Sequence, residues 1–247
     1  MKATAADSSA GFVLHTYPYR ETSLIVEAFT RGHGRMTFVA RGAKRPRGAL
    51  RGNLHPFQGL HFSWFGRAEM KTLKEVEHEI IFPQMAGDAL LSAFYLNELL
   101  MKLTVREDAH ESLFDAYHDA LQGLSGRNAS ATGEVAQILR RFEVVFLREI
   151  GYALHLTEEA DSHAPIEPGQ RYIYIMERGP VAARLLKDDP RWRDEPTVLG
   201  KTLLDMDRGE LLDANSQQQA KALMRRVINR LLGDKPLHTR QLMRELR

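Results

Sequence analysis

The spacing of the apolar residues changes at Pro83, and this change constrains the fold more than any other feature. Before Pro83, short segments rich in Val, Ile, Leu and aromatic residues alternate with turn residues, as in β-proteins. After Pro83, apolar residues recur every three or four positions, as on α-helices. The sequence therefore predicts an α+β fold, with a β domain at residues 1–82 and a mainly α-helical domain at residues 83–247.

Five predicted strands in roughly 70 residues favour a small closed Greek-key barrel, because a two-sheet sandwich usually needs about seven strands. The strands are expected at Gly11–Tyr17, Ser23–Phe29, Met36–Ala40, Leu60–Phe65 and Met70–Val76. Alternation places Leu60, Phe62 and Trp64 on the buried face. A long loop, Arg41–Asn53, follows the third strand, and its four Gly and Pro residues exclude regular structure.

The second domain contains several helical patterns and one irregular region. Helices are expected at Gly87–Thr104, Glu111–Leu124, Glu134–Ile150, from an N-cap at Ser216 to Gly233, and at Thr239–Leu246, with a connector at Gly123–Gly133. Five prolines interrupt residues 152–200. Within that region, Tyr172–Met176 and Val181–Leu186 are expected to pair as a hairpin.

Composition excludes several classes of protein. The chain has 247 residues and no cysteine, which excludes disulfides, thiolate zinc sites and cysteine nucleophiles. The first ten residues lack an apolar core of signal-peptide length, and no uncharged run approaches the ~18 residues of a membrane span. We therefore expect a soluble intracellular protein that needs no cofactor and no membrane.

One stretch is strongly basic although the whole chain has a formal charge of only +2. Its cations are Arg31, Arg35, Arg41, Lys44, Arg45, Arg47 and Arg51, without one Asp or Glu among them. Charge of one sign with several glycines suits a sugar-phosphate chain, although a charged loop can also be simply solvated. We interpret the stretch as a nucleic-acid-binding surface, in which the first two cations lie at a hairpin and the others on a mobile loop.

Aromatic residues near this stretch are candidates for stacking on unpaired bases. They are Tyr19, Phe38, Phe57 and Phe65. Core packing is the simpler interpretation for each of them except Phe65, because alternation places Phe65 on the face opposite Trp64.

Motifs of catalysis are absent. The sequence has no phosphate-binding Gly-x-x-x-x-Gly-Lys-Ser/Thr loop and no Gly-x-Ser-x-Gly elbow. Gly32-His33-Gly34 lacks the rest of a dinucleotide fingerprint, so we interpret it as a hairpin turn. Asp205 and Asp207 could hold a magnesium ion, but a solvated turn explains them more simply.

A cluster of potential metal ligands lies in the irregular region. It comprises His155, Glu158, Glu159, Asp161 and His163. Such a density of ligands could bind a divalent ion, yet nothing in the sequence orients the two histidines, so an exposed acidic loop is the simpler interpretation and no metal is expected.

Arg140 and Arg141 lie where the apolar stripe of the third helix meets its polar face. At that border they could hold an acidic peptide with a hydrophobic end, or they could simply extend over the surface of their own domain.

The order of the motifs resembles the family of the bacterial recombination mediator RecO. In the first domain the resemblance rests on Glu21-Thr22-Ser23-Leu24, Val39-Ala40-Arg41-Gly42-Ala43-Lys44, Leu54-His55-Pro56-Phe57 and Lys71-Thr72-Leu73. In the second it rests on Tyr95-Leu96-Asn97-Glu98-Leu99-Leu100, Arg140-Arg141-Phe142-Glu143, Gly151-Tyr152 and Gly233-Asp234-Lys235-Pro236-Leu237.

This resemblance implies an N-terminal five-stranded OB-fold barrel and a helical C-terminal domain. It also implies binding of single- and double-stranded DNA, ATP-independent annealing and, with RecR, loading of RecA onto strands coated by single-stranded-DNA-binding protein. Arg140, with Arg141 beside it, lies where the family holds the acidic tail of that coating protein. Relatives often carry a four-cysteine zinc module near residues 152–200, which this chain cannot form.

Two other functions stay open at this point. The first is an RNA-binding module joined to a helical protein-interaction domain, because barrels of this kind bind either nucleic acid. The second is a metal-dependent nuclease that uses the cluster between His155 and His163.

Overall fold

The structure is a computed structural model that describes residues 7–66, 68–126, 132–186, 188–192 and 195–245. The chain packs as two compact units, residues 1–126 with 237–247, and residues 127–236. This division differs from a boundary at residue 82, because helices that follow Pro83 pack in the same unit as the barrel. Among the described residues, no helix has the length and apolar character that crossing a membrane requires.

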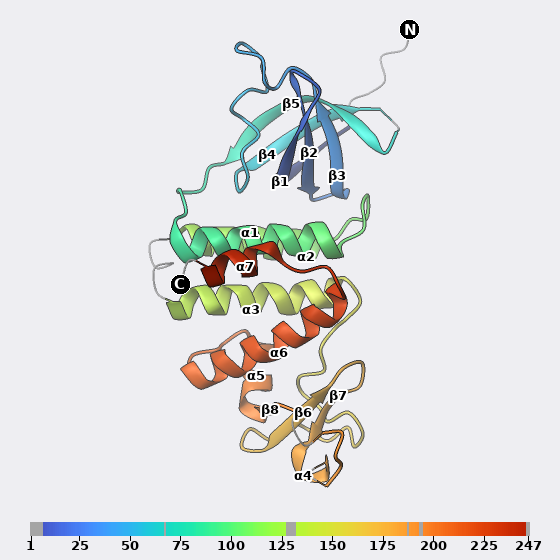
Figure 1. Cartoon of the computed structure of the whole chain (residues 1–247), viewed down its shortest axis with the longest axis vertical. Coiled ribbons are helices and arrows are strands. Elements are labelled where there is room, and N and C mark those ends of the chain that lie inside the picture. Colours follow the sequence, from blue (N-terminus) through green and yellow to red (C-terminus); the bar gives the residue numbers. More distant parts are fainter. Residues whose placement is uncertain (1–6, 67, 127–131, 187, 193–194, 246–247) are drawn as a thin grey trace. The chain divides into compact units, whose positions relative to one another are not determined.

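The first unit contains the predicted closed five-stranded barrel (Figure 1). Its strands are β1 (Asp7–Tyr19), β2 (Ser23–Thr30), β3 (Gly34–Ala40), β4 (Gly59–Phe65) and β5 (Met70–Ile80). Their order around the barrel is β1-β2-β3-β5-β4, and only the β3–β5 pair is parallel. Leu60, Phe62 and Trp64 are buried in the barrel core, which confirms the face predicted from alternation.

Three helices belong to the same unit: α1 (Gly87–Leu103), α2 (Glu111–Ser125) and α7 (His238–Glu245). The ring of Phe12 on β1 packs on that of Phe114 on α2, with centroids 5.4 Å apart. Glu98 on α1 accepts hydrogen bonds from the backbone N–H groups of His238 and Thr239, at 2.8 and 3.0 Å. Burial raises the pKa of Glu98, but these bonds outweigh burial and hold that pKa below its usual value.

The described part of the second unit contains four helices and a three-stranded sheet of order β7-β6-β8. Its elements are α3 (Thr132–Glu149), β6 (Arg171–Ile175), β7 (Gly179–Ala182), α4 (Ala183–Leu186), β8 (Thr197–Leu199), α5 (Gly200–Arg208) and α6 (Ala214–Leu232). Strands β6 and β7 form the predicted hairpin, but residues 183–186 turn into α4 instead of extending the strand. Strand β8 and helix α5 were not predicted from the sequence. Residues 127–131 of the predicted connector lie outside the described residues.

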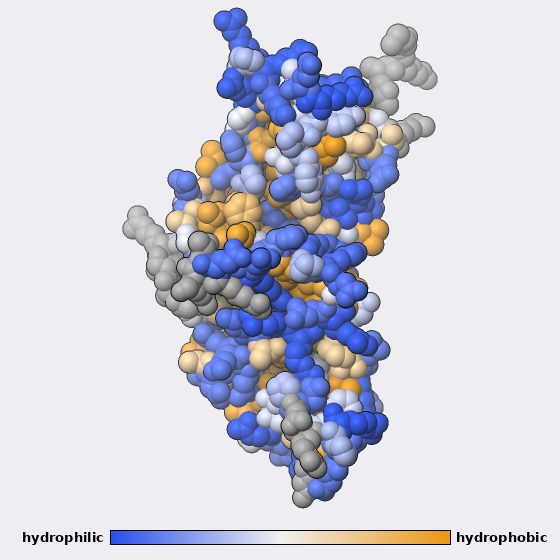
Figure 2. All heavy atoms as spheres, in the orientation of Figure 1, coloured by the Kyte–Doolittle hydropathy of each residue, from blue (hydrophilic) through white to orange (hydrophobic). Residues whose placement is uncertain are grey.

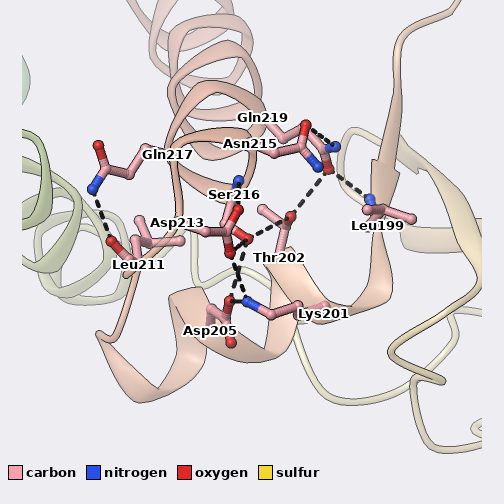
Figure 3. A network of polar contacts seen from close by, with 10 residues as sticks. All are labelled: Leu199, Lys201, Thr202, Asp205, Leu211, Asp213, Asn215, Ser216, Gln217 and Gln219. Atoms are coloured by element: carbon pink, nitrogen blue, oxygen red, sulfur yellow. Dashed lines mark hydrogen bonds and ion pairs between the residues drawn. The ribbon is translucent and has the colours of Figure 1, made fainter. Parts of the chain in front are cut away.

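A polar network joins α5 to α6 and corrects two predictions (Figure 3). The N-cap of α6 is Asp213 and not Ser216, because the Asp213 carboxylate accepts the backbone N–H of Ser216 at 2.8 Å. Asp205 and Asp207 lie on α5 and not in a solvated turn. Asp205 is almost fully buried, where it pairs with the amine of Lys201, which also lies 2.8 Å from Asp213.

Candidate nucleic-acid interface

The loop between β3 and β4 is anchored to the barrel. Ala43, Leu50 and Leu54 are buried and belong to the barrel core. Between these anchors the chain forms linked turns, in which the backbone N–H groups of Arg45 and Gly48 donate to the carbonyls of Gly42 and Arg45 at 2.9 and 3.0 Å. The segment that the sequence predicted to be a loop without helix or strand thus consists of turns that are fixed to the barrel at three single apolar residues.

This arrangement displays cations without neutralising them. The side chains of five residues are exposed: Arg41, Lys44, Arg45, Arg47 and Arg51. Within the described ranges, none of the five forms an ion pair with a carboxylate. Arg51 is additionally held by a hydrogen bond from its guanidinium to the carbonyl of Pro46, at 3.0 Å. The loop therefore presents uncompensated positive charge on a defined backbone, which attracts phosphates.

A cleft of about 760 Å³ separates this loop from the β1–β2 turn. Its walls include Arg41 and Arg45 on one side and Tyr19, Arg20 and Glu21 on the other. A second hollow of about 650 Å³ continues along the loop, lined by arginines, glycines and a proline. Figure 2 shows hydrophilic residues gathered at this end of the barrel, at the top of the view. We name the two hollows together the cationic cleft.

The first two cations of the basic stretch, Arg31 and Arg35, form ion pairs within the first unit. Arg31 pairs with Glu111 and Asp115 on α2, and its guanidinium lies over the ring of Phe114, 5.3 Å from the centroid. Arg35 is mostly buried and lies 3.1 Å from a carboxylate oxygen of Glu27. The sequence grouped these two residues with the DNA-binding cations, but their charges are already compensated at the helical end of the barrel.

Of the four aromatic candidates, Phe38 and Phe57 are buried and unavailable for stacking. Phe65 is 44% exposed, as alternation predicted, and Tyr19 lines the cationic cleft. Arg20, which was not predicted from the sequence, lines the same cleft, and its guanidinium lies 5.2 Å from the ring centroid of Tyr19. The β1–β2 turn that contains Arg20 lies beside the start of the basic loop, where the N–H of Lys44 donates to the carbonyl of Thr22 at 3.0 Å. A charged residue in the turn before β2 was therefore a possible signal for this site.

The neighbouring residues Arg140 and Arg141 of α3 differ in their environments. Arg140 is buried and donates to the carboxylate of Glu143 at 2.6 Å. Arg141 is exposed, and its Nε donates at 2.6 Å to the carbonyl of Gly209, at the end of α5. Of the pair, Arg141 is therefore the residue accessible to a partner.

The cluster between His155 and His163 is engaged in local contacts. Asp161 forms an ion pair with Arg178 at 2.6 Å, and Glu159 accepts hydrogen bonds from Ser162 and Gln170. Across the part of the chain that the structure describes, no three His, Asp or Glu side chains are grouped as a metal site would require.

Comparison with known proteins agrees with this architecture. Residues 5–81 match the family model described as recombination protein O N terminal, and residues 85–241 match recombination protein O C terminal. A protein of Aromatoleum aromaticum named DNA repair protein RecO is 51% identical, over 97% of this chain and 96% of its own length. Proteins of the same name from Nitrosospira multiformis and Thiobacillus denitrificans are 46% and 47% identical, over 97% of this chain and 95% and 92% of theirs. The chain therefore belongs to the recombination protein O family.

Proposed function

We propose that this chain binds DNA through the cationic cleft and acts in DNA repair as a mediator without catalytic activity of its own. The observation that carries the proposal is the anchored β3–β4 loop, whose five exposed cations lack carboxylate partners among the described residues. Family membership supports the same role, since the similar proteins are named DNA repair proteins.

The mechanism that we propose is electrostatic. Cations of the cleft neutralise phosphates on two complementary strands, which lowers the repulsion between the strands and lets them anneal without ATP. With RecR, the protein would load RecA onto strands coated by single-stranded-DNA-binding protein. RecR, RecA and single-stranded-DNA-binding protein are proposed as partners from the family resemblance. Their joint action takes place on DNA, and we propose that the basic loop binds that DNA.

A salt titration of DNA binding tests the first step. Replacing Arg45 and Arg47 by Ala is expected to weaken binding evenly across sequences and to reduce the log-log salt slope by about two. Arg171→Ala with Arg184→Ala removes the same charge from the second unit and should leave the slope unchanged. Equal slopes for the wild type and the Arg45/Arg47 variant would exclude the loop as the binding surface.

Annealing of complementary strands precoated with single-stranded-DNA-binding protein tests the mediator role directly. The wild type should accelerate annealing without ATP, and the Arg45/Arg47 variant should not. Competition between DNA and RNA strands of matched sequence separates this function from that of an RNA-binding module. Tighter binding of the RNA strand would favour the RNA-binding module. Strands that are cut during long incubation with Mg²⁺ or Mn²⁺ would contradict a non-catalytic role.

We also propose that Arg140 and Arg141 of α3 form the site for the acidic tail of single-stranded-DNA-binding protein, with Arg141 as the contacting residue. Replacing Arg140 by Glu would place a second carboxylate beside buried Glu143 and disturb the fold, so the informative variant is Arg141→Glu. It should lose binding of an acidic peptide that ends in Phe and retain DNA binding. Arg148→Glu, an exposed position on the same helix, is the matched control.

A further inference from the structure

Five outward-facing residues form one row across all five strands of the barrel. In the strand register, Tyr17 pairs with Ile25 and Ile25 with Val39. Val39 then pairs with Thr72, and Thr72 with Phe65. Val39 lies between the core residues Phe38 and Ala40, while Ile25 and Thr72 are followed by the core residues Val26 and Leu73, so the row lies on the outer surface. We name these five residues the aromatic belt.

The belt is an exposed, largely apolar surface with an aromatic ring at each end. Tyr17 is 42% exposed and Phe65 is 44% exposed, while the three residues between them are partly exposed. Four steps between neighbouring strands, of about 4.8 Å each, separate the two rings by roughly 19 Å along the sheet. That length suits a short segment of an extended polymer, because single-strand sites on OB folds start at about four nucleotides.

The belt borders the cationic cleft. Val39 belongs to the belt and also lines the cleft together with Arg41 and Arg45. Tyr19, two residues beyond Tyr17 on the same strand, lines the cleft as well. Side chains two residues apart on a strand share a face, so the apolar row and the arginines form one continuous outer surface. A ligand on this surface would meet cations along one edge and aromatic rings along the other.

We propose that the aromatic belt is a base-stacking platform, which makes this surface prefer unpaired nucleic-acid strands to duplexes. This inference rests on the proposed function, because the cationic cleft must first hold the phosphates. An unpaired strand has free base faces to place on Tyr17 and Phe65. In a duplex the base faces are stacked on one another, so a duplex gains only the phosphate contacts. The arginines thus provide general affinity, and the belt provides strand selectivity.

The test is fluorescence anisotropy with the full-length chain, using a labelled oligothymidine, a hairpin duplex of equal phosphate number and an abasic oligonucleotide. Replacing both Tyr17 and Phe65 by Ala should weaken oligothymidine binding about a hundredfold, near tenfold for each ring, and change duplex binding less than twofold. The wild type should bind the abasic strand about as weakly as the double variant binds oligothymidine. The salt slope should be the same for both proteins, since no phosphate contact is removed.

Controls separate this inference from the proposed function. Tyr17→Phe keeps a ring and should retain binding, and Tyr152→Ala removes an exposed ring from the second unit without effect. Thermal melting of the double variant must match that of the wild type. Equal loss for the single strand and the duplex, or no loss for either, would overturn the stacking platform. If the Arg45/Arg47 variant also binds DNA with wild-type affinity, the proposed function fails as well. If the Arg45/Arg47 variant loses affinity and the Tyr17/Phe65 variant does not, the proposed function stands and only the stacking platform is excluded.

Discussion

The phenolic oxygen of Tyr117 on α2 donates a hydrogen bond to Oδ1 of Asn97 on α1, at 2.5 Å. The amide of Asn97 donates in turn to the carbonyl of Leu14 on β1, at 2.9 Å. A single buried chain of hydrogen bonds therefore links two helices to the barrel within the first unit. Burial raises the pKa of Tyr117 far above its usual value, so the phenol stays a neutral donor at any physiological pH.

Tyr117→Phe should destabilise the first unit by about 1–3 kcal/mol, because the carbonyl oxygen of Asn97 loses this donor in a site closed to water. Urea denaturation measures the change, with a Trp192→Phe background so that buried Trp64 alone reports on the barrel. Tyr152→Phe, at an exposed position, should leave the free energy of unfolding unchanged. Identical midpoints for the Tyr117 and Tyr152 variants would show that the hydrogen bond contributes nothing.

Gly48→Ala should weaken DNA binding without altering charge. A Cβ atom at Gly48 would collide with the carbonyl oxygen of Gly42, so the linked turns that orient Arg45 cannot form unchanged. We expect a threefold to tenfold loss of DNA affinity, of the order of 1 kcal/mol, together with a salt slope close to that of the wild type. Ala49→Ser, at the exposed neighbouring position, is the control for filter binding. Wild-type affinity in Gly48→Ala would mean that the loop conformation is unimportant.

Asp213→Asn should reduce the acid sensitivity of the second unit. The Lys201 amine, followed by the N–H and hydroxyl of Ser216, holds the pKa of Asp213 well below its usual 3.8. A depressed folded-state pKa gives stability that is present above the unfolded value and is lost as pH falls through the folded value. Asn still caps the helix, so the wild type should be more stable near pH 6 and the difference should shrink below about pH 4.

Urea unfolding at both pH values, at low and high salt, measures this difference. Salt should reduce it, because both partners are exposed to solvent. Asp207→Asn removes a carboxylate from α5 that lies outside the network of Figure 3, and it should show no comparable pH dependence. If the stability difference between the wild type and Asp213→Asn grew on acidification, the ionised Asp213 carboxylate would not be the stabilising group.

The barrel and most helices could be predicted because their signals are local. Alternation in Leu60, Phe62 and Trp64 determines which face is buried without knowledge of any distant residue. Gly233 likewise ends α6 as its position after the apolar stripe predicts. The N-cap was misplaced by three residues because both Asp213 and Ser216 are good capping residues, and only the fold shows which side chain accepts the bond.

The parts that could not be predicted depend on distant partners. The sequence places Arg31 and Arg47 in one basic stretch, but in the structure only Arg31 of the two faces acidic residues 80 or more positions away. The aromatic belt is likewise invisible in the sequence, because neighbours such as Val39 and Thr72 meet only through the parallel pairing of β3 with β5. The local sequence pattern therefore predicts helices, strands and their buried faces. Which charges are compensated and which surface residues are neighbours depends on how the strands and helices pair in the fold.

Glu27→Gln should destabilise the first unit more than any surface substitution. The Glu27 carboxylate is buried, lies within 3.1 Å of the guanidinium groups of Arg35 and Arg106, and accepts the hydroxyl of Thr37 at 3.0 Å. A neutral amide leaves the mostly buried guanidinium of Arg35 poorly compensated, although Arg106 keeps Glu69 at 2.8 Å, and we expect a cost of about 2–4 kcal/mol. Glu75→Gln, on the exposed part of β5, is the matched control for thermal unfolding. Equal melting temperatures would show that the ion pairs are unimportant.

Arg31→Ala should affect stability and Arg47→Ala should affect DNA binding, although both remove one arginine from the same basic stretch. Arg47 is exposed on the loop without a carboxylate partner among the described residues, so its loss should lower DNA affinity and reduce the salt slope by about one. The charge of Arg31 is compensated by Glu111 and Asp115, so its loss should leave the slope unchanged and instead lower the melting temperature slightly. Filter binding between 50 and 200 mM salt, roughly the range over which phosphate contacts dominate, measures both slopes. If Arg31→Ala lost as much slope as Arg47→Ala, DNA would have to displace the α2 carboxylates, and the binding surface would extend to the helical end of the barrel.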